Sequence, residues 1–379
     1  MPEPVDYSQR GAWAVGYRAG ASAEGAKGHP ELGIWYPGLN PDGVDEAITY
    51  DFMLKSPDFG PGPGEVEGHA LADAPADSEH GPYPLVVFSH GYSANAPWYS
   101  NLPEQYASHG FVVVAPEHIE QDWFENAASV IQRPVDITQT LDYIEAATEP
   151  GGALAGLVDT SRVAVVGHSF GGYTALASAG ATLEMNTLNE RCATLAPDDP
   201  KTFLCLPLAG READLAALAG LDAVPEGNWP SFADPRVTAI IPIAGDAYMF
   251  DGVGLSEITV PMMAIGGTAD TGTPFDWGVQ LAYDEVSSPY KALVGFEGAE
   301  HMFPANDCAD MPWTMDFLYA EQICNDPVWN RQEAHELLHY FSTAFLLDTL
   351  AGDEAAALAL SPDEAQFPGI TYATTIAAQ

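Results

Sequence analysis

Short apolar runs recur along the chain, and most of them end at glycine or at a small polar residue. Uninterrupted apolar runs of this length are typical of strands that are buried on both faces of a sheet. Residues 46–54 differ, because they alternate between apolar and polar positions as a half-buried strand does. The strands are expected at residues 32–36, 46–54, 85–88, 111–115, 163–166, 237–243, 260–265 and 291–296.

Apolar residues at helical spacing separate several of these strands. Residues 131–147 carry Val135, Leu141 and Ile144 on one face, and a second long helix is expected at residues 329–350. Strands that alternate with helices predict an α/β fold, in which a mostly parallel, eight-stranded sheet is covered by helices on both faces.

One stretch, residues 183–235, breaks this alternation between the fifth and sixth expected strands. It contains a cysteine pair, several prolines and one short helix rich in alanine and leucine. We therefore expect the 379 residues to form a single domain with an insertion over the sheet, either a lid or a pocket wall. Residues 351–379 are expected to form a C-terminal tail.

The charge balance is strongly acidic, with 54 Asp and Glu against 12 Lys and Arg and a formal net charge of −42. Such a charge repels phosphate backbones, so a nucleic-acid partner is not expected. The acidic residues are spread along the chain, which predicts a solvated acidic surface. No apolar run of about 18 residues occurs, so no membrane span is expected. The oligomeric state stays open.

Four cysteines form two pairs that are local in sequence, Cys192 with Cys205 and Cys308 with Cys324. Their even number and spacing predict two disulfides and a secreted or periplasmic protein. The alternative is four reduced, buried thiols in a cytosolic protein. The first residues, Met-Pro-Glu-Pro, show neither the basic start nor the apolar stretch of a secretory signal, so a signal is expected to be absent from this numbering.

The sequence Gly-His-Ser-Phe-Gly, residues 167–171, follows the fifth expected strand and precedes a small-residue segment with helical potential. Glycines at both ends of a G-x-S-x-G motif allow a turn too tight for larger side chains. Such a turn would lift the Ser169 hydroxyl between a strand and a helix N-terminus, as in a nucleophile elbow. The alternative is a glycine-rich turn with an incidental serine.

Two further candidates follow the seventh and eighth expected strands, Asp270 and His301. The carboxyl ends of parallel strands meet at one edge of a sheet, so both can converge on Ser169. His301 would accept the serine proton, and Asp270 would orient the imidazole. The oxyanion donors are expected to be the amides of Phe170 and Tyr92. These roles predict a carboxylic ester hydrolase that needs no cofactor.

Three segments carry a resemblance to a known family: residues 84–92 (PLVVFSHGY), residues 106–116 (YASHGFVVVAP) and residues 167–172 (GHSFGG). They resemble α/β-hydrolases, and more narrowly the branch of platelet-activating-factor acetylhydrolases and dienelactone-hydrolase-like bacterial polyesterases. The resemblance implies a calcium-independent serine esterase for short-chain, aromatic or polymeric esters. The alternative that it implies is a phospholipase A2-like acetylhydrolase for short-acyl phospholipids.

The resemblance leaves two positions open for the acid. Asp246 matches the acid of the acetylhydrolases, and Asp270, in Gly-Gly-Thr-Ala-Asp-Thr-Gly, matches the acid of the bacterial esterases and is preferred. His168, Tyr248 and Phe250 are then the expected substrate-binding residues, the two aromatic residues as walls of an acyl pocket.

A motif of a different mechanistic class lies near the C-terminus. His335-Glu336-Leu-Leu-His339 matches the H-E-x-x-H of zinc metallopeptidases, in which two histidines one helical turn apart share a metal. The longer form of the motif is not present, because Ser342 and Phe345 stand where glycine and histidine would be required. No metal site is expected, and the motif is interpreted as part of a C-terminal helix that packs on the sheet.

Overall fold

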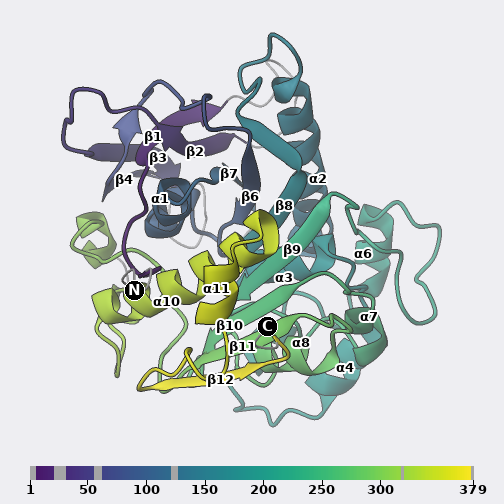
Figure 1. Ribbon diagram of the computed structural model, residues 1–379. Helices are drawn as coiled ribbons and strands as arrows, with labels where there is room; N and C mark the ends of the chain where they lie inside the picture. The colour runs from purple at the N-terminus through teal and green to yellow at the C-terminus, as the bar shows by residue number, and fades with distance from the viewer. Residues whose placement is uncertain (1–5, 21–30, 55–61, 121–126, 317–319, 377–379) are drawn as a thin grey trace.

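A computed structural model describes residues 6–20, 31–54, 62–120, 127–316 and 320–376. Its centre is a twisted sheet with the strand order β12-β11-β10-β9-β8-β6-β7-β2-β1-β5 (Figure 1). The six strands from β7 to β11 in this order are parallel, whereas β2, β1 and β12 pair antiparallel towards the two edges. The strands are β1 (Ala14–Gly20), β2 (Leu32–Gly38), β5 (Leu71–Ala72), β6 (Tyr83–Ser89), β7 (Val112–Pro116), β8 (Val158–His168), β9 (Val237–Ile243), β10 (Met262–Gly267), β11 (Lys291–Phe296) and β12 (Ile370–Thr374).

Two apolar layers form because successive side chains of a strand point to opposite faces. In β6, Leu85 and Val87 belong to one buried cluster, and Val86 and Phe88 belong to the other. Helices α2, α3 and α8 cover the first face, and α1 and α10 cover the second (Figure 1). The helical elements are η1 (Ala96–Tyr99), α1 (Asn101–Ser108), α2 (Ala127–Thr148), α3 (Phe170–Ser178), α4 (Met185–Ala193), α5 (Thr202–Cys205), α6 (Glu212–Leu218), α7 (Gly252–Ser256), α8 (Val279–Glu285), η3 (Pro312–Asp316), α9 (Ala320–Cys324), α10 (Arg331–Leu346), η4 (Leu347–Ala351) and α11 (Glu354–Ala359).

The prediction of a mixed α/β fold with a large, mostly parallel sheet is confirmed, but the membership of the sheet differs from the expected eight strands. Residues 46–54 do not join it, because β3 (Ile48–Leu54) pairs with β4 (Gly62–Gly68) in a separate hairpin. Strands β1, β5 and β12 join it instead. The expected C-terminal tail therefore contains a helix, α11, and an edge strand.

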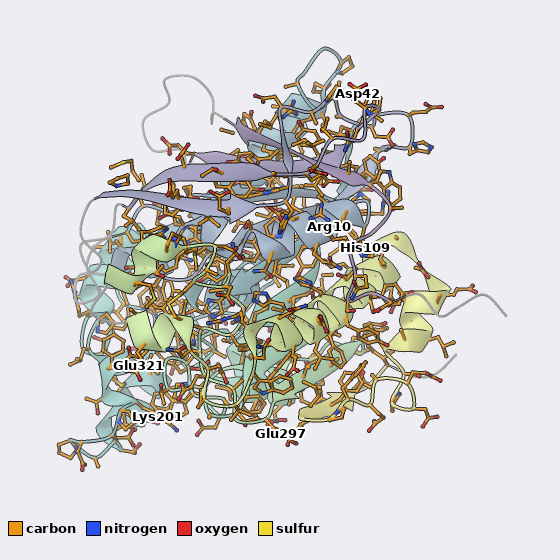
Figure 2. The ribbon with its side chains drawn as sticks, turned by 90° about the vertical axis from the view of Figure 1, so that its left-hand side faces the viewer. Arg10, Asp42, His109, Lys201, Glu297 and Glu321 are labelled. Atoms are coloured by element: carbon orange, nitrogen blue, oxygen red, sulfur yellow. A yellow bond between two sulfur atoms is a disulfide. The ribbon has the colours of Figure 1, made fainter. Side chains whose placement is uncertain are left out.

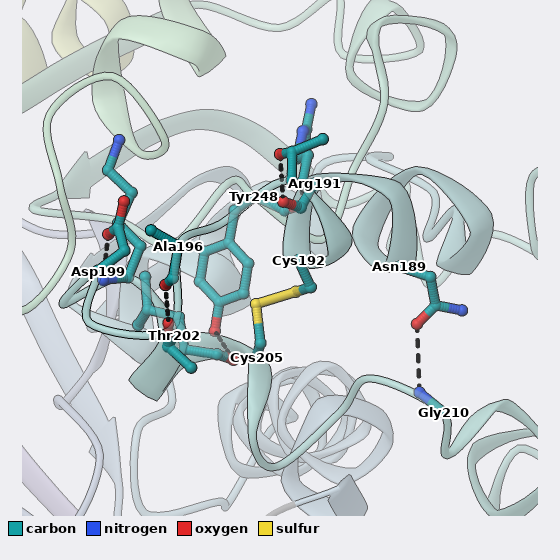
Figure 3. The surroundings of a disulfide bond; sticks show 12 residues. Asn189, Arg191, Cys192, Ala196, Asp199, Thr202, Cys205, Gly210 and Tyr248 are labelled. Atoms are coloured by element: carbon teal, nitrogen blue, oxygen red, sulfur yellow. Dashed lines mark hydrogen bonds between the residues drawn. A yellow bond between two sulfur atoms is a disulfide. The ribbon is translucent and has the colours of Figure 1, made fainter.

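Both expected disulfides are present, Cys192–Cys205 and Cys308–Cys324. The first joins α4 to α5 inside the inserted segment, whose third helix is α6 (Figure 3). The second closes a loop between β11 and α10. Each disulfide therefore closes a segment that lies outside the central sheet.

Exposed acidic side chains lie at separate edges of the molecule, as Asp42, Glu297 and Glu321 show (Figure 2). Among the residues that the structure describes, no helix is both long enough and apolar enough to cross a lipid bilayer.

Candidate active site

Ser169 lies at the corner between β8 and α3, with backbone angles φ 58° and ψ −121°. Its amide donates a hydrogen bond to the Ile243 carbonyl, 2.8 Å away. The two glycines of the motif are required by contact, because a Cβ on Gly171 would lie 1.9 Å from the Ser89 carbonyl oxygen and one on Gly167 would lie 2.3 Å from the Gly171 carbonyl oxygen. The sequence thus folds into the strand–turn–helix corner that the motif predicts.

His301 and Asp270 lie next to this serine. The Nε2 atom of His301 is 2.9 Å from Ser169 Oγ, and its Nδ1 atom is 2.8 and 3.0 Å from the two oxygens of Asp270. A carboxylate can only accept, so Nδ1–H donates to it and Nε2 presents its lone pair to the serine hydroxyl. The amides of Gly272 and Thr273 donate to Asp270 Oδ1 at 2.8 and 2.7 Å, which fixes the carboxylate.

The environment of His301 favours a positive charge on its ring. Burial alone would lower the pKa of His301, but the charge and hydrogen bond of Asp270 oppose it, and Asp246 and Glu300 add to their effect. The pKa of His301 is therefore raised above its ordinary value of 6.5. The ring can accept a proton from the serine, and its neighbours stabilise the charged form that results.

The ring of His168 holds the backbone of His301 in place. Its Nε2 atom is 2.9 Å from the His301 carbonyl oxygen, and its Nδ1 atom is 2.9 Å from the Tyr99 hydroxyl oxygen. Burial, followed by the nearby charge of His301, lowers the pKa of His168 well below its ordinary value. A neutral ring then donates from Nε2 and accepts at Nδ1. His168, predicted to bind substrate, lines the pocket, and both of its ring nitrogens form hydrogen bonds within the protein.

Asp246 is buried next to this array. Its Oδ1 atom accepts a hydrogen bond of 2.8 Å from the hydroxyl of Thr273, whose amide holds Asp270. Burial raises the pKa of Asp246 to about 6, against the effects of this hydrogen bond and of His301. Of the two carboxylates that the sequence left open, Asp270 is the one in contact with His301 Nδ1.

A pocket of about 200 Å³ opens in front of Ser169. Tyr92 and Phe170, the expected oxyanion donors, line it together with His301. Gly91 also reaches the nucleophile, because a Cβ on it would lie 3.6 Å from Ser169 Cβ and 2.8 Å from the Tyr99 hydroxyl oxygen. The residues that follow β6 and the first residue of α3 therefore meet at one side of the serine.

Two walls of the pocket come from the disulfide-closed segments, and the sequence analysis missed them. Phe203 and Leu204 precede Cys205, and Ile323 precedes Cys324; all three line the pocket. Behind Ile323, the buried Arg331 donates hydrogen bonds to the carbonyls of Ile323 and Met302. The sequence feature that could have pointed to these wall residues is their position next to cysteines, in segments that interrupt the α/β pattern.

The expected acyl-pocket walls Tyr248 and Phe250 are not among the residues that line this pocket. Phe250 stacks on Tyr173 of α3, with ring centroids 5.4 Å apart, and both rings are fully buried. The Tyr248 hydroxyl donates to the Leu204 carbonyl oxygen at 3.5 Å, and the Tyr248 ring is fully buried beside the Cys192–Cys205 disulfide (Figure 3). This part of the prediction is corrected because the chain turns back into the core after Asp246.

His335 and His339 lie on α10, away from Ser169. The Nε2 atom of His335 is 2.9 Å from the Ala305 carbonyl oxygen, and that of His339 is 3.0 Å from Asn101 Oδ1. A carbonyl oxygen can only accept, so His335 Nε2 donates a proton to it and does not present a lone pair to a metal. Across the described ranges, no three His, Cys, Asp or Glu residues are grouped as metal ligands.

A serine on a tight strand-to-helix turn, with a histidine and an acid following later parallel strands, defines a protein of the α/β-hydrolase type. The chain belongs to the chlorophyllase family, because the sequence model of that family matches residues 73–371. The match covers the described strands β6 to β11 and all three residues of the hydrogen-bonded array.

Three curated relatives illustrate the range of similar proteins. The chain is 26% identical over 292 residues to Chlorophyllase-1 of Arabidopsis thaliana, covering 73% of this chain and 74% of the relative. It is 27% identical over 227 residues to Cutinase est2 of Thermobifida alba, covering 60% and 55%. It is 29% identical over 135 residues to the platelet-activating factor acetylhydrolase of Cavia porcellus, covering 25% and 31%.

The matched region spans about half of the cutinase and about a third of the acetylhydrolase. The resemblance to acetylhydrolases and bacterial polyesterases, noted from the sequence, is confirmed by these relatives. The sequence motifs alone did not point to the chlorophyllases.

Proposed function

We propose that this protein is a carboxylic ester hydrolase in which Ser169 is the nucleophile, His301 the general base and acid, and Asp270 the residue that orients His301. The observation that carries the proposal is the unbroken relay from Asp270 through His301 to Ser169 Oγ, with contacts of 2.8 and 2.9 Å, beside an apolar pocket. The relatives named above, a cutinase and an acetylhydrolase among them, add support.

The reaction has two halves. Ser169 Oγ attacks the ester carbonyl carbon while His301 Nε2 takes the hydroxyl proton, and the carbonyl π electrons move to the oxygen. The tetrahedral intermediate collapses, the C–O bond of the alcohol breaks, and His301 returns the proton to the leaving alkoxide. Water then attacks the acyl-enzyme in the same way, which releases the acid and restores Ser169.

The oxyanion of each intermediate would accept hydrogen bonds from the amides of Phe170 and Tyr92. Phe170 is the first residue of α3, where amides have no partner within the helix and the helix dipole favours negative charge. Losing one such donor typically costs about 10²- to 10³-fold in kcat.

The pocket supports a short acyl group rather than a long one. Its volume of about 200 Å³ lies below the roughly 300 Å³ at which pockets for drug-sized ligands begin. A second hollow of about 530 Å³ shares Gly272, His301 and Met302 with it and would take the alcohol part or the rest of a polymer chain. The first hollow is closed by Phe203 and Leu204, so we assign to the inserted segment the role of a pocket wall.

The second hollow also bears on the alternative, an acetylhydrolase for phospholipids. It is lined by Glu300, Glu321 and Asp326, which would repel a phosphate group. This charge favours neutral alkyl or aromatic esters, or polyesters, over phospholipids. The two disulfides further support a secreted or periplasmic location.

The test is hydrolysis of p-nitrophenyl esters with acyl chains from two to twelve carbons. We expect turnover to be highest for the short chains, and we expect a sulfonyl fluoride to block it while labelling the peptide that contains Ser169. A protein that turns over none of these esters and reacts with no serine reagent would contradict the proposal.

Replacing Phe203 by alanine is expected to shift the preference towards longer acyl chains. Phe203 is half exposed at the rim of the pocket, so its removal opens the pocket outwards. The ratio of kcat/KM for an eight-carbon over a two-carbon ester should rise by roughly tenfold, since one methylene in an apolar pocket is worth about 10- to 200-fold. Leu218→Ala, which removes an exposed leucine of α6 in the same insertion, is the control and should leave this ratio unchanged. Equal ratios in wild type and Phe203→Ala would refute the role of Phe203.

The pH dependence of kcat/KM should have an acid limb above pH 6.5. Only neutral His301 can accept the serine proton, so activity is lost as the pH falls through the raised pKa of His301. Asp246→Asn removes a negative charge that helps to raise this pKa, so the limb should move to lower pH. A limb that stays in place or moves to higher pH in Asp246→Asn would contradict this electrostatic account.

A further inference from the structure

A buried arginine of α2 contacts both sides of the region that faces Ser169. Arg133 is 1% exposed, and its Nη1 atom donates to the His90 carbonyl at 2.6 Å. Its Nη2 atom donates to the Gly91 carbonyl at 3.1 Å, and its Cζ atom lies 5.1 Å from the centroid of the Phe170 ring. One guanidinium thus touches the loop after β6 and the first residue of α3.

The charge of Arg133 is paired with a buried carboxylate, that of Glu120. Glu120, which follows β7, accepts from Arg133 Nε at 2.8 Å and lies 2.7 Å from its Nη2. The other carboxylate oxygen of Glu120 accepts from the amide of Ser93 at 2.6 Å. Burial raises the pKa of Glu120, and the charge of Arg133 acts against this. Arg133 therefore binds the loop at His90 and Gly91, and Glu120 binds it at Ser93.

These contacts determine which way the peptide groups of the loop face. A trans peptide is planar, so its N–H points away from its C=O. The carbonyl of Gly91 points at Arg133, and the amide in the same peptide belongs to Tyr92, which lines the pocket of Ser169. A hydrogen bond to the Gly91 carbonyl from behind thus aims the Tyr92 amide forwards.

Residues inside the loop also hold the Gly91 carbonyl. It accepts from His90 Nδ1 at 2.7 Å and from the amide of Ala94 at 3.3 Å. These bonds shape the loop but cannot fix its position relative to Ser169, because both donors move with it. Arg133 belongs to α2, outside the loop, so its hydrogen bonds can fix the position of the loop relative to the rest of the protein.

Helix α2 is itself fixed to the helix that begins at the nucleophile. Pro134 has no N–H and leaves the Val130 carbonyl, four residues earlier, without its helical partner. The Tyr173 hydroxyl of α3 donates to that carbonyl at 2.8 Å. Arg133 directly precedes Pro134, so the hydrogen bond between Tyr173 and Val130 fixes its position relative to α3.

A second hydrogen-bonded array lies under the same loop. His118 Nε2 is 2.9 Å from Ser89 Oγ, and His118 Nδ1 is 2.7 Å from Asp136 Oδ2. All three residues are buried, so this array of serine, histidine and acid is closed to substrate. The His118 amide donates to His90 Nε2 at 3.0 Å, and the array therefore supports the loop from below.

We propose that Arg133, paired with Glu120, is the positioning residue of the oxyanion hole: it holds the 90–93 loop against α3 so that the amides of Tyr92 and Phe170 face one point above Ser169. This rests on the proposed ester hydrolysis. Burying an ion pair adds little net stability, so we infer that the benefit of this pair is the loop geometry that it imposes.

The test compares Arg133→Lys with the charge-neutral pair Arg133→Gln/Glu120→Gln, which avoids leaving one charge buried alone. We expect the double variant to lose about 10²- to 10³-fold in kcat with KM nearly unchanged, since the oxyanion develops only after the substrate is bound. Lysine keeps the charge but not the fork of donors, so Arg133→Lys should fall in between.

Two further readouts separate positioning from stability. Affinity for a trifluoromethyl ketone, which forms a tetrahedral adduct with serine, should fall in parallel with kcat/KM. The control Arg236→Gln removes an ion-paired arginine that also binds a carbonyl of α2, that of Thr138, and should lower the melting temperature without lowering kcat. Arg133 variants that lose only thermal stability, or that keep ketone affinity, would overturn the proposal.

A crystal structure of the double variant tests the inference without turnover. We expect the Gly91–Tyr92 peptide to be rotated or displaced relative to Ser169. An unchanged peptide would overturn the inference even if the protein is an active esterase. Wild-type protein without Ser169-dependent hydrolysis would instead overturn the proposed function, while the orientation of this peptide would still decide the role of Arg133.

Discussion

Ser169→Ala is expected to lower kcat for p-nitrophenyl esters by about 10⁶-fold, to the level left by binding and the oxyanion donors alone. The loss is large because no other hydroxyl group is in contact with His301 Nε2 at the described site. Folding should be unaffected, since the substitution removes one oxygen atom and the backbone at φ 58° is equally strained with alanine. Steady-state kinetics and a melting curve measure both effects.

The matched control for this variant is Ser178→Ala at the other end of α3. Ser178 is also buried, and its hydroxyl has no hydrogen-bond partner among the residues that the structure describes, so its removal should leave kcat unchanged. EDTA should leave wild-type activity unchanged as well. Activity that survives in Ser169→Ala and is abolished by EDTA would refute the serine mechanism and return attention to His335 and His339.

Asp270→Asn should lower kcat by about 10⁴-fold while preserving the fold. An asparagine can present its amide nitrogen to His301 Nδ1, which favours the tautomer that carries its proton on Nε2. Such a ring cannot accept the proton of Ser169. Proton NMR of the imidazole and the pH profile of kcat would report the change of tautomer together with the loss of rate.

Asp246→Asn is the matched comparison, since it makes the same chemical change at the other candidate for the acid. Asp246 accepts from Thr273 and acts on His301 through its charge alone, so its loss should be far milder than that of Asp270. The reverse order, with Asp246→Asn as the more severe variant, would identify Asp246 as the acid.

The strands with the clearest sequence signal are those that are buried along nearly their whole length. Strands β6, β7, β10 and β11 consist almost entirely of apolar residues, so a continuous run identifies them. Strands outside the parallel centre carry no such signal: β1 contains Tyr17 and Arg18 beside glycine and alanine, and β4 reads GPGEVEG, which resembles a loop. Their pairing depends on neighbours that are distant in sequence.

The proposed nucleophile, base and acid could be found from the sequence because each follows a strand of one parallel sheet, and such ends meet. The pocket walls could not, because Phe203 and Ile323 meet only through the tertiary fold. Arg133 had a weak signal, a charged residue on a helix that packs against the sheet, but only the structure brings its guanidinium to Gly91. Tyr248 and Phe250 were wrong as walls because sequence proximity to Asp246 says nothing of direction.

The two disulfides have a consequence for how such a protein can diversify. The residues proposed to react follow strands of the sheet, whereas Phe203, Leu204 and Ile323 belong to segments outside the sheet that are closed by disulfides. Mutations in those disulfide-closed segments can change which substrate enters the pocket without altering the residues that react. A laboratory library confined to residues 193–204 and 309–323 would sample new substrates on an unchanged reaction centre.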